Sequence, residues 1–161
     1  MRRWTLLILL SASLWACSRA PLSVPVRDFN VDVALVRSNQ AVFVKQSFDR
    51  PPVSLSRVAL EGTLRYQQTS AQFTFFVSDE EPCQNQTQGF YLCDPNAPHI
   101  ERAGTADFRS GPSQPLQLTA ERLTQGINSG NLWIGVRLES SLATAGTLEF
   151  RNMVARVAVL P

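Results

Sequence analysis

The chain has 161 residues, of which 15 are basic and 13 acidic, so its formal net charge at neutral pH is +2. We do not expect the protein to bind nucleic acid, because the sequence has no run of basic residues that would neutralise phosphates. The length and the hydrophobic fraction of 44% suit one globular domain with a single core.

The first 16 residues are arranged like the signal of an exported protein. Arg2 and Arg3 precede a mostly apolar stretch, and small residues then lead to Cys17. The stretch from residue 4 to residue 16 is 13 residues long, whereas a helix needs about 20 residues to cross the hydrocarbon core of a bilayer. The pattern therefore predicts a signal peptide over residues 1–16 and argues against a permanent span.

The residues at the predicted cleavage point, Leu14, Trp15, Ala16 and Cys17, resemble the lipobox of bacterial lipoproteins. That motif has a leucine three residues before a cysteine and a small residue directly before it; Trp15 departs from the usual smaller residue. The resemblance implies cleavage after Ala16 and a diacylglycerol (with palmitate-type acyl chains) on Cys17, which would hold the protein on the membrane. Ser18, in place of a retention aspartate, implies sorting to the outer membrane if the cell has one.

Two alternatives to the lipid anchor remain open: a soluble secreted protein with an unmodified Cys17, and an uncleaved anchor. Under the lipoprotein interpretation the protein is exported, attached to the cell membrane or outer membrane, and faces the periplasm or the cell exterior. Removal of residues 1–16 leaves 13 basic and 13 acidic residues. The mature protein is then nearly neutral.

Residues 17–28 are predicted to be the lipidated N-terminus and a tether. They contain two prolines and no sustained periodicity. Eleven extended residues reach at most ~36 Å, so the domain of residues 29–161 would stand clear of the membrane. The alternative is that Val24 and Val26 fold back as a first edge strand.

Apolar and polar residues alternate with a period of two through most of the remaining chain, which predicts half-buried strands. The last strand changes phase, because Leu148 and Phe150 are apolar at even positions whereas Met153 and Ala155 are apolar at odd ones. Asn152 therefore predicts a bulge or a move between sheets. The other expected strands cover residues 31–35, 42–45, 58–67, 72–78 and 132–138.

One short segment, "LTAERLTQGINSG", has helical spacing instead. Ala120, Leu123 and Ile127 recur at i, i+3 and i+7, Thr119 is placed to cap the start, and residues 128–130 are placed to end it. We expect a helix of at most two turns that plugs one end of the fold.

The predicted fold class is all-β, with two antiparallel sheets packed as a sandwich and one short helix. Seven to nine strands are expected, with Greek-key or jelly-roll connectivity. Residues 79–115 show little strand signal and are expected to leave the framework as an excursion.

Cys83 and Cys93 are an even pair once Cys17 carries lipid, which predicts a disulfide in an oxidising compartment. Closing their 11-residue loop would contribute roughly 3 kcal/mol. A zinc or redox pair is the alternative, but the spacing is far from C-x-x-C and His99 is the only histidine. His99 is predicted to be a solvated loop residue. Without a Gly-x-Ser-x-Gly elbow beside it, a catalytic triad is not expected.

Carboxylates gather around the cysteine loop at Asp79, Glu80, Glu81 and Asp94. They are a weak calcium candidate, because calcium takes six to eight oxygen ligands from irregular loops. "DEEP" lacks the alternating spacing of a dedicated calcium loop, so a solvated acidic turn without any cofactor is the main expectation. A glycosidase pair drawn from the same carboxylates is a further alternative.

Aromatic residues are the candidate binding residues. Trp133 lies on the opposite phase from its apolar neighbours, and Phe90 and Tyr91 lie inside the cysteine loop. Exposed rings would stack on sugars or anchor a protein partner. The alternative is that Trp133 lies under residues 119–130 and Tyr91 packs within its own loop.

The function expected from these features is that of a non-catalytic envelope lipoprotein with a structural or protein-binding role. Its partner would be an envelope protein or a cell-wall polysaccharide. The alternative is a carbohydrate-binding jelly-roll module, because the closing stretch "GTLEFRNMVARVAV" loosely resembles the last strands of such modules. A hydrolase of unknown substrate is the third hypothesis.

Overall fold

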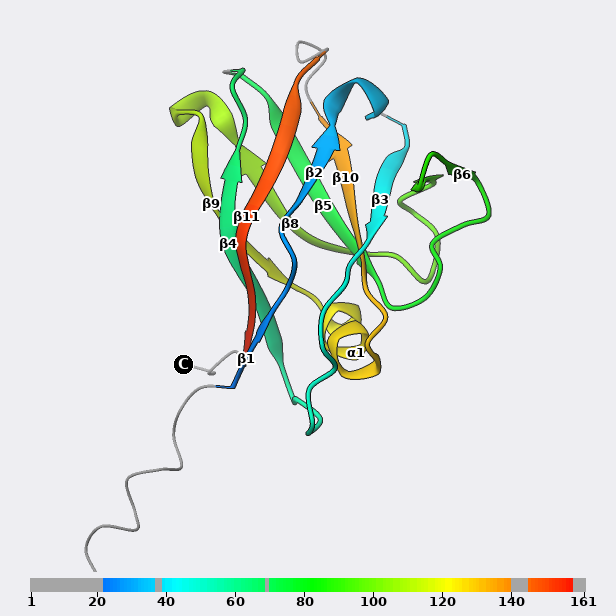
Figure 1. The fold of residues 1–161 in the computed structure, drawn as a ribbon. Coiled ribbons are helices and arrows are strands. Elements are labelled where there is room, and N and C mark those ends of the chain that lie inside the picture. Colours follow the sequence, from blue (N-terminus) through cyan, green and yellow to red (C-terminus); the bar gives the residue numbers. More distant parts are fainter. Residues whose placement is uncertain (1–21, 37–38, 69, 140–144, 158–161) are drawn as a thin grey trace, which may run out of the picture.

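Two antiparallel sheets lie face to face in the computed structural model, which describes residues 22–36, 39–68, 70–139 and 145–157 (Figure 1). The all-β sandwich with one short helix is thereby confirmed. The predicted signal peptide and Cys17 lie outside the described residues. Within those ranges no helix is long and apolar enough to cross a membrane.

The two sheets contain eleven strands in the described part of the chain, more than the seven to nine expected. Sheet A consists of β1 (Ser23–Pro25), β2 (Phe29–Asp32), β4 (Val58–Arg65), β9 (Ser113–Thr119) and β11 (Thr147–Val157). Sheet B consists of β3 (Ala41–Lys45), β5 (Gln72–Ser78), β6 (Gln86–Thr87), β7 (Phe90–Cys93), β8 (Glu101–Asp107) and β10 (Trp133–Leu138). The helix α1 covers Glu121–Ser129, and two 3-10 helices cover Val33–Leu35 and Phe108–Ser110.

The strand order is that of a jelly roll. Sheet A runs β2-β11-β4-β9, with β1 continuing along β11 beyond β2, and sheet B runs β6-β7-β3-β10-β5-β8. Without β1 and the β6–β7 hairpin, the strands from β2 to β5 alternate between the sheets, and so do those from β8 to β11. Each sheet then holds four interleaved strands, as in two Greek keys.

The first strand begins inside the stretch predicted to be the tether. Ser23 pairs with Arg156 of β11, and Val24 and Val26 are buried in the core. Of the two alternatives, the edge strand is the one observed, because the valines bury apolar surface while β11 satisfies the backbone. The folded body therefore starts before the expected boundary at Phe29.

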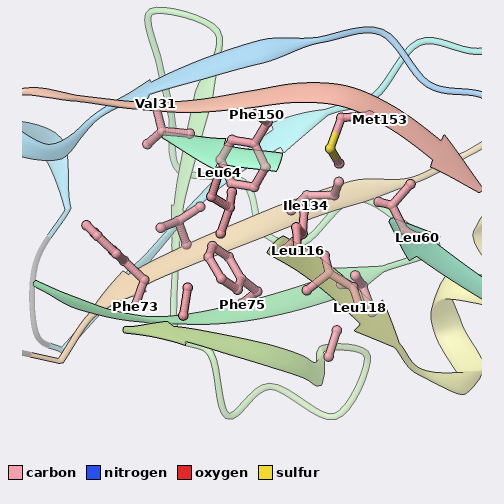
Figure 2. Close-up of a cluster of buried hydrophobic side chains, with 14 of the residues drawn as sticks. Val31, Leu60, Leu64, Phe73, Phe75, Leu116, Leu118, Ile134, Phe150 and Met153 are labelled. Atoms are coloured by element: carbon pink, nitrogen blue, oxygen red, sulfur yellow. The ribbon is translucent and has the colours of Figure 1, made fainter. Parts of the chain in front are cut away.

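The core lies between the two sheets (Figure 2). Phe73 and Phe75 of β5 point inward, as their phase predicts, and the ring of Phe75 meets that of Phe150 edge-on at 5.8 Å. Leu123 and Ile127 of α1 are also fully buried. The helix closes one end of the sandwich (Figure 1), so the plug is confirmed, although its nine residues exceed the two turns expected.

The phase change in the last strand is the predicted bulge. Asn152 has φ of 54°, and the pairing of β11 with β4 shifts register between Arg151 and Val154. The extra residue keeps Leu148 and Met153 on the same, inward face despite their different parity.

Three local expectations need correction. Residues 33–35 form a 3-10 helix and not the end of a strand, because the Asp32 carboxylate accepts a hydrogen bond from the backbone N–H of Ala34. Thr119 ends β9, and Ala120, which makes no side-chain cap, precedes α1. The excursion covers residues 79–100 only, since β8 and β9 are framework strands. Gly130, in the left-handed conformation, ends the helix as expected.

Candidate binding face

The outer face of sheet B divides into two halves. One half, which we term the covered half, is a second apolar cluster separate from the main core. The other half, over β5, β8 and β10, is an open polar groove. The covered half consists of Ala41, Phe43, Phe76, Cys93 and Trp133, with Cys83, Tyr91 and Ile100 packed against them.

Trp133 is the largest side chain of the covered half and is only 5% exposed. Its indole stacks beneath the Lys45 ammonium, whose Nζ lies 4.9 Å from the ring centroid. Gly135 makes the packing possible, because a Cβ there would lie 2.5 Å from the Phe43 ring. Trp133 thus offers no exposed platform for a sugar or a partner, contrary to the binding hypothesis.

The cover over Trp133 is also not the one expected. Helix α1 packs against β4, β5 and β8 and sends its apolar face into the main core. Tyr91 and Ile100, at β7 and at the end of the excursion, pack on the Trp133 cluster instead. Tyr91 is half-buried there, and Phe90 is half-buried against the main core.

The disulfide between Cys83 and Cys93 is confirmed, with the two Cα atoms 5.8 Å apart. It ties the start of the excursion to β7, which pairs with β3 at the sheet edge. Two further contacts stabilise the excursion. The Ser78 hydroxyl lies within hydrogen-bond distance of the carbonyls of Glu80 (2.7 Å) and His99 (3.0 Å).

His99 belongs to this packing and is half-buried, not a fully solvated residue. Its Nε2 lies 2.8 Å from the carbonyl oxygen of Pro82. Because a carbonyl oxygen only accepts, Nε2 carries the hydrogen and donates it. The ring therefore joins the two ends of the excursion.

The predicted acidic cluster is split by an arginine. Arg122 of α1 places Nη1 2.5 Å from Asp79 Oδ1 and 4.0 Å from Glu80 Oε1. Glu81 is exposed. Asp94 accepts a hydrogen bond from the backbone N–H of Asn96 at 2.9 Å. In the described ranges, no three or more histidine, cysteine or acidic side chains are grouped to hold a metal ion.

Glu101 has a structural role that the sequence pattern did not suggest. Its two carboxylate oxygens accept hydrogen bonds from the backbone N–H groups of Glu121 (3.2 Å) and Arg122 (3.0 Å). These are among the first amides of α1, which have no partner within the helix. A strand residue 20 positions earlier thus caps the helix in place of Thr119.

The groove in the open half has a volume of about 440 Å³, within the range of small-ligand sites. Phe73 and Ala106 contribute its apolar part. Its polar lining comes from β5, β8, β10 and Glu139, which directly follows β10. The polar residues are Gln72, Thr74, Arg102, Thr105, Asp107, Arg137 and Glu139.

Glu139 is fixed in the groove by two neighbours. Arg137 donates from Nε (2.9 Å) and Nη2 (2.6 Å) to Glu139 Oε1, and the buried Thr74 hydroxyl bonds the same carboxylate. Desolvation acts to raise the pKa of Glu139. The hydrogen bonds from Thr74 and Arg137, with the charges of Arg137 and Arg102, outweigh it and leave the pKa below its ordinary value.

Asp107 is fixed at the other side of the groove. The Arg109 side chain and backbone N–H donate to its carboxylate and lower its pKa to about 2. Gln72 Nε2 donates to Asp107 Oδ2 at 3.1 Å. Both carboxylates of the groove are therefore ionised and paired near neutral pH.

Arg102 is the remaining charged residue of the groove. It is exposed, and no ion pair within 4.0 Å joins it to any residue that the structure describes. The sequence pattern did not single out the groove, because its residues lie in three strands separated along the chain. The one feature of the sequence that pointed to this site was the alternation in residues 132–139, which places Arg137 and Glu139 on the outward face.

The described surface has other hollows, including the following two. One, of about 700 Å³, lies at an end of the sandwich beside Tyr66, whose hydroxyl donates to the Ala145 carbonyl at 2.8 Å. The other, of about 660 Å³, lies beside the first turns of α1 and includes Arg57. Loop residues line part of both hollows. The groove of sheet B is instead lined by strand residues and by Glu139, which directly follows β10.

No protein-family model matches the chain, and no curated protein matches it either.

Proposed function

We propose that this chain is an exported, lipid-anchored envelope protein whose non-catalytic sandwich binds a protein partner through the open groove of sheet B. The observation that carries the binding role is the groove, in which hydrogen bonds hold Asp107, Arg137 and Glu139 before any ligand arrives. Preorganised groups lose less conformational entropy on binding.

Export is supported by the disulfide and by the lipobox resemblance. Disulfides such as the one between Cys83 and Cys93 persist mainly outside the reducing cytosol. The lipobox resemblance of residues 14–17 supplies the anchor. Two or more acyl chains give stable attachment, whereas a single chain gives only marginal binding.

The non-catalytic role is supported by the acid–base properties of the site. General acids and bases work best with a pKa near the operating pH. The pKa of Glu139 is instead lowered, against desolvation, by the hydrogen bonds from Thr74 and Arg137, and that of Asp107 by the hydrogen bonds from Arg109. His99 uses Nε2 to donate to a backbone carbonyl in the excursion.

Mass spectrometry of the protein purified from membranes tests the anchor. We expect the N-terminal peptide to begin at Cys17 and to carry the mass of a diacylglycerol. An intact Met1 terminus, or a Cys17 peptide without lipid, would contradict the proposal. Cross-linking in intact cells from an engineered cysteine at Thr105, exposed at the rim of the groove, should trap a protein. A cysteine at exposed Arg156, on sheet A, is the matched control.

A carbohydrate-binding role is the second candidate. Jelly-roll strand order is shared with lectin domains, and the groove offers both donors and acceptors across a sheet face. Retention on an insoluble polysaccharide that is lost with Arg102→Gln would favour this candidate. Trp133→Ala is a poor test, because loss of a buried ring also destabilises the fold.

A further inference from the structure

We infer that the groove binds a carboxylate of an acidic segment in the partner protein, with Arg102 as its main contact and Arg137 as its second. This inference rests on the proposed function and names the chemistry of the partner. Its evidence is the distribution of charge and hydrogen bonds among the groove residues.

The four charged residues that line the groove balance one another, and Arg109, which pairs with Asp107 from outside the lining, brings the total to one cation in excess. Asp107 is neutralised by Arg109, which stands outside the groove lining, and Glu139 is neutralised by Arg137. Arg102 remains without an ion pair inside 4.0 Å among the residues described. Its charge nonetheless acts on Glu139, so it lies close to the other charged groups. An anion would complete this arrangement.

The two guanidinium groups are suited to a carboxylate. Arg137 is held by Glu139 and by stacking on Phe76, whose ring centroid lies 5.3 Å from the guanidinium carbon. A planar guanidinium presents parallel N–H donors that match the two oxygens of a carboxylate. Arg137 already donates from Nε and Nη2 to Glu139, so only its other N–H groups serve a ligand, which is why Arg102 is the main contact. Thr105, exposed at the rim, adds a hydroxyl donor.

The apolar surroundings favour a peptide over an acidic sugar. Sugar sites use an exposed aromatic face for stacking, and the aromatic side chains near the groove do not provide one. Phe73 is fully buried, and the Arg137 guanidinium covers Phe76. An acidic peptide needs only donors, charge and an open groove, and all three are present.

Fluorescence anisotropy with a labelled hexaglutamate peptide tests the inference, using the full-length protein purified in detergent. We expect saturable binding that weakens at ~0.15 M salt, because exposed charges are screened. Arg102→Gln should weaken binding about tenfold, equivalent to about 1.4 kcal/mol, because the neutral amide loses the charge that attracts the carboxylate.

The matched control is Arg57→Gln, which removes the same charge from an exposed arginine beside α1. It should change the affinity less than twofold. Thermal unfolding of both variants should match that of the unmodified protein, since both side chains are exposed.

Three outcomes would overturn the inference: equal loss of affinity in the two variants, no binding of hexaglutamate, or Arg102-dependent binding of soluble polygalacturonate in place of the peptide. The last result would assign the groove to an acidic glycan. The lipid on Cys17 is measured separately by mass spectrometry. A negative result in the peptide-binding experiment would therefore overturn the inference about the groove without contradicting the lipid anchor.

Discussion

The covered half and the open half of the outer face of sheet B both contain side chains of β10, but these side chains have different environments. Trp133 and Arg137 lie on one face of β10, four residues apart. The excursion of residues 79–100 packs over the first and leaves the second in an open groove. The comparison shows that outward side chains of one strand become core where apolar neighbours and the excursion cover them, and stay accessible where polar neighbours surround them.

Replacing Trp133 with alanine is expected to have the largest effect. Removal of a buried aromatic side chain leaves a cavity and costs about 3–5 kcal/mol. Urea denaturation followed by circular dichroism measures the loss of unfolding free energy. Trp133→Phe should cost clearly less, because the indole N–H has no hydrogen-bond partner among the described residues. A loss below about 1 kcal/mol for the alanine variant would mean that the covered half is solvated.

Removing the disulfide should have the next largest effect. The double variant Cys83→Ser/Cys93→Ser is expected to lose about 3 kcal/mol of unfolding free energy, because the unfolded chain regains the freedom of the loop. The same urea measurement on the oxidised and the chemically reduced wild-type protein provides the control. Identical stability of all three forms would argue that the excursion is held by its packing alone.

Glu101→Ala tests the link between the excursion and α1. Two backbone N–H groups at the helix start would lose their acceptor, and losses of helix caps typically cost about 1 kcal/mol. The melting temperature should fall by a few degrees, as such a loss shifts it by roughly 2–8 °C depending on domain size. Glu121→Ala is the control, because the exposed Glu121 side chain is not the acceptor of these amides. Equal shifts in both variants would contradict the capping role.

The smallest effect is expected in the open half. The folded-state pKa of Asp107, about 2, lies below its ordinary value of 3.8, so its stabilising contribution is complete above pH ~4 and is lost as the pH falls toward 2. An NMR titration of the carboxyl group should show the low midpoint in the wild-type protein. Arg109→Gln should move the midpoint upward, whereas Arg57→Gln should not. A wild-type midpoint near 3.8 would show that the pairing is absent in solution.

Local patterns predicted the parts of the fold that depend on neighbouring residues. The period of two placed Phe73 and Phe75 inside, and the change of parity located the bulge at Asn152. These features follow from the pleat of a single strand. Strand number and spacing favoured a Greek-key or jelly-roll sandwich over a barrel, but they left the choice between the two and the strand order open.

The candidate site could not be predicted in the same way. The outward phase of Trp133 is compatible with exposure or with burial, and only the position of the distant excursion decides between them. The groove joins Thr74, Arg102 and Arg137, which become neighbours through the order β10-β5-β8. Pairing between strands far apart in the chain is not encoded in any one segment.

Quenching of Trp133 fluorescence by acrylamide tests the covered half most directly. Trp4 and Trp15, the other two tryptophans of the chain, lie in the predicted signal peptide, so Trp133 is the sole tryptophan of the protein that begins at Cys17. We predict blue-shifted emission and weak quenching in the oxidised protein, because the indole is 5% exposed. Quenching as efficient as that of free tryptophan in water would contradict the account.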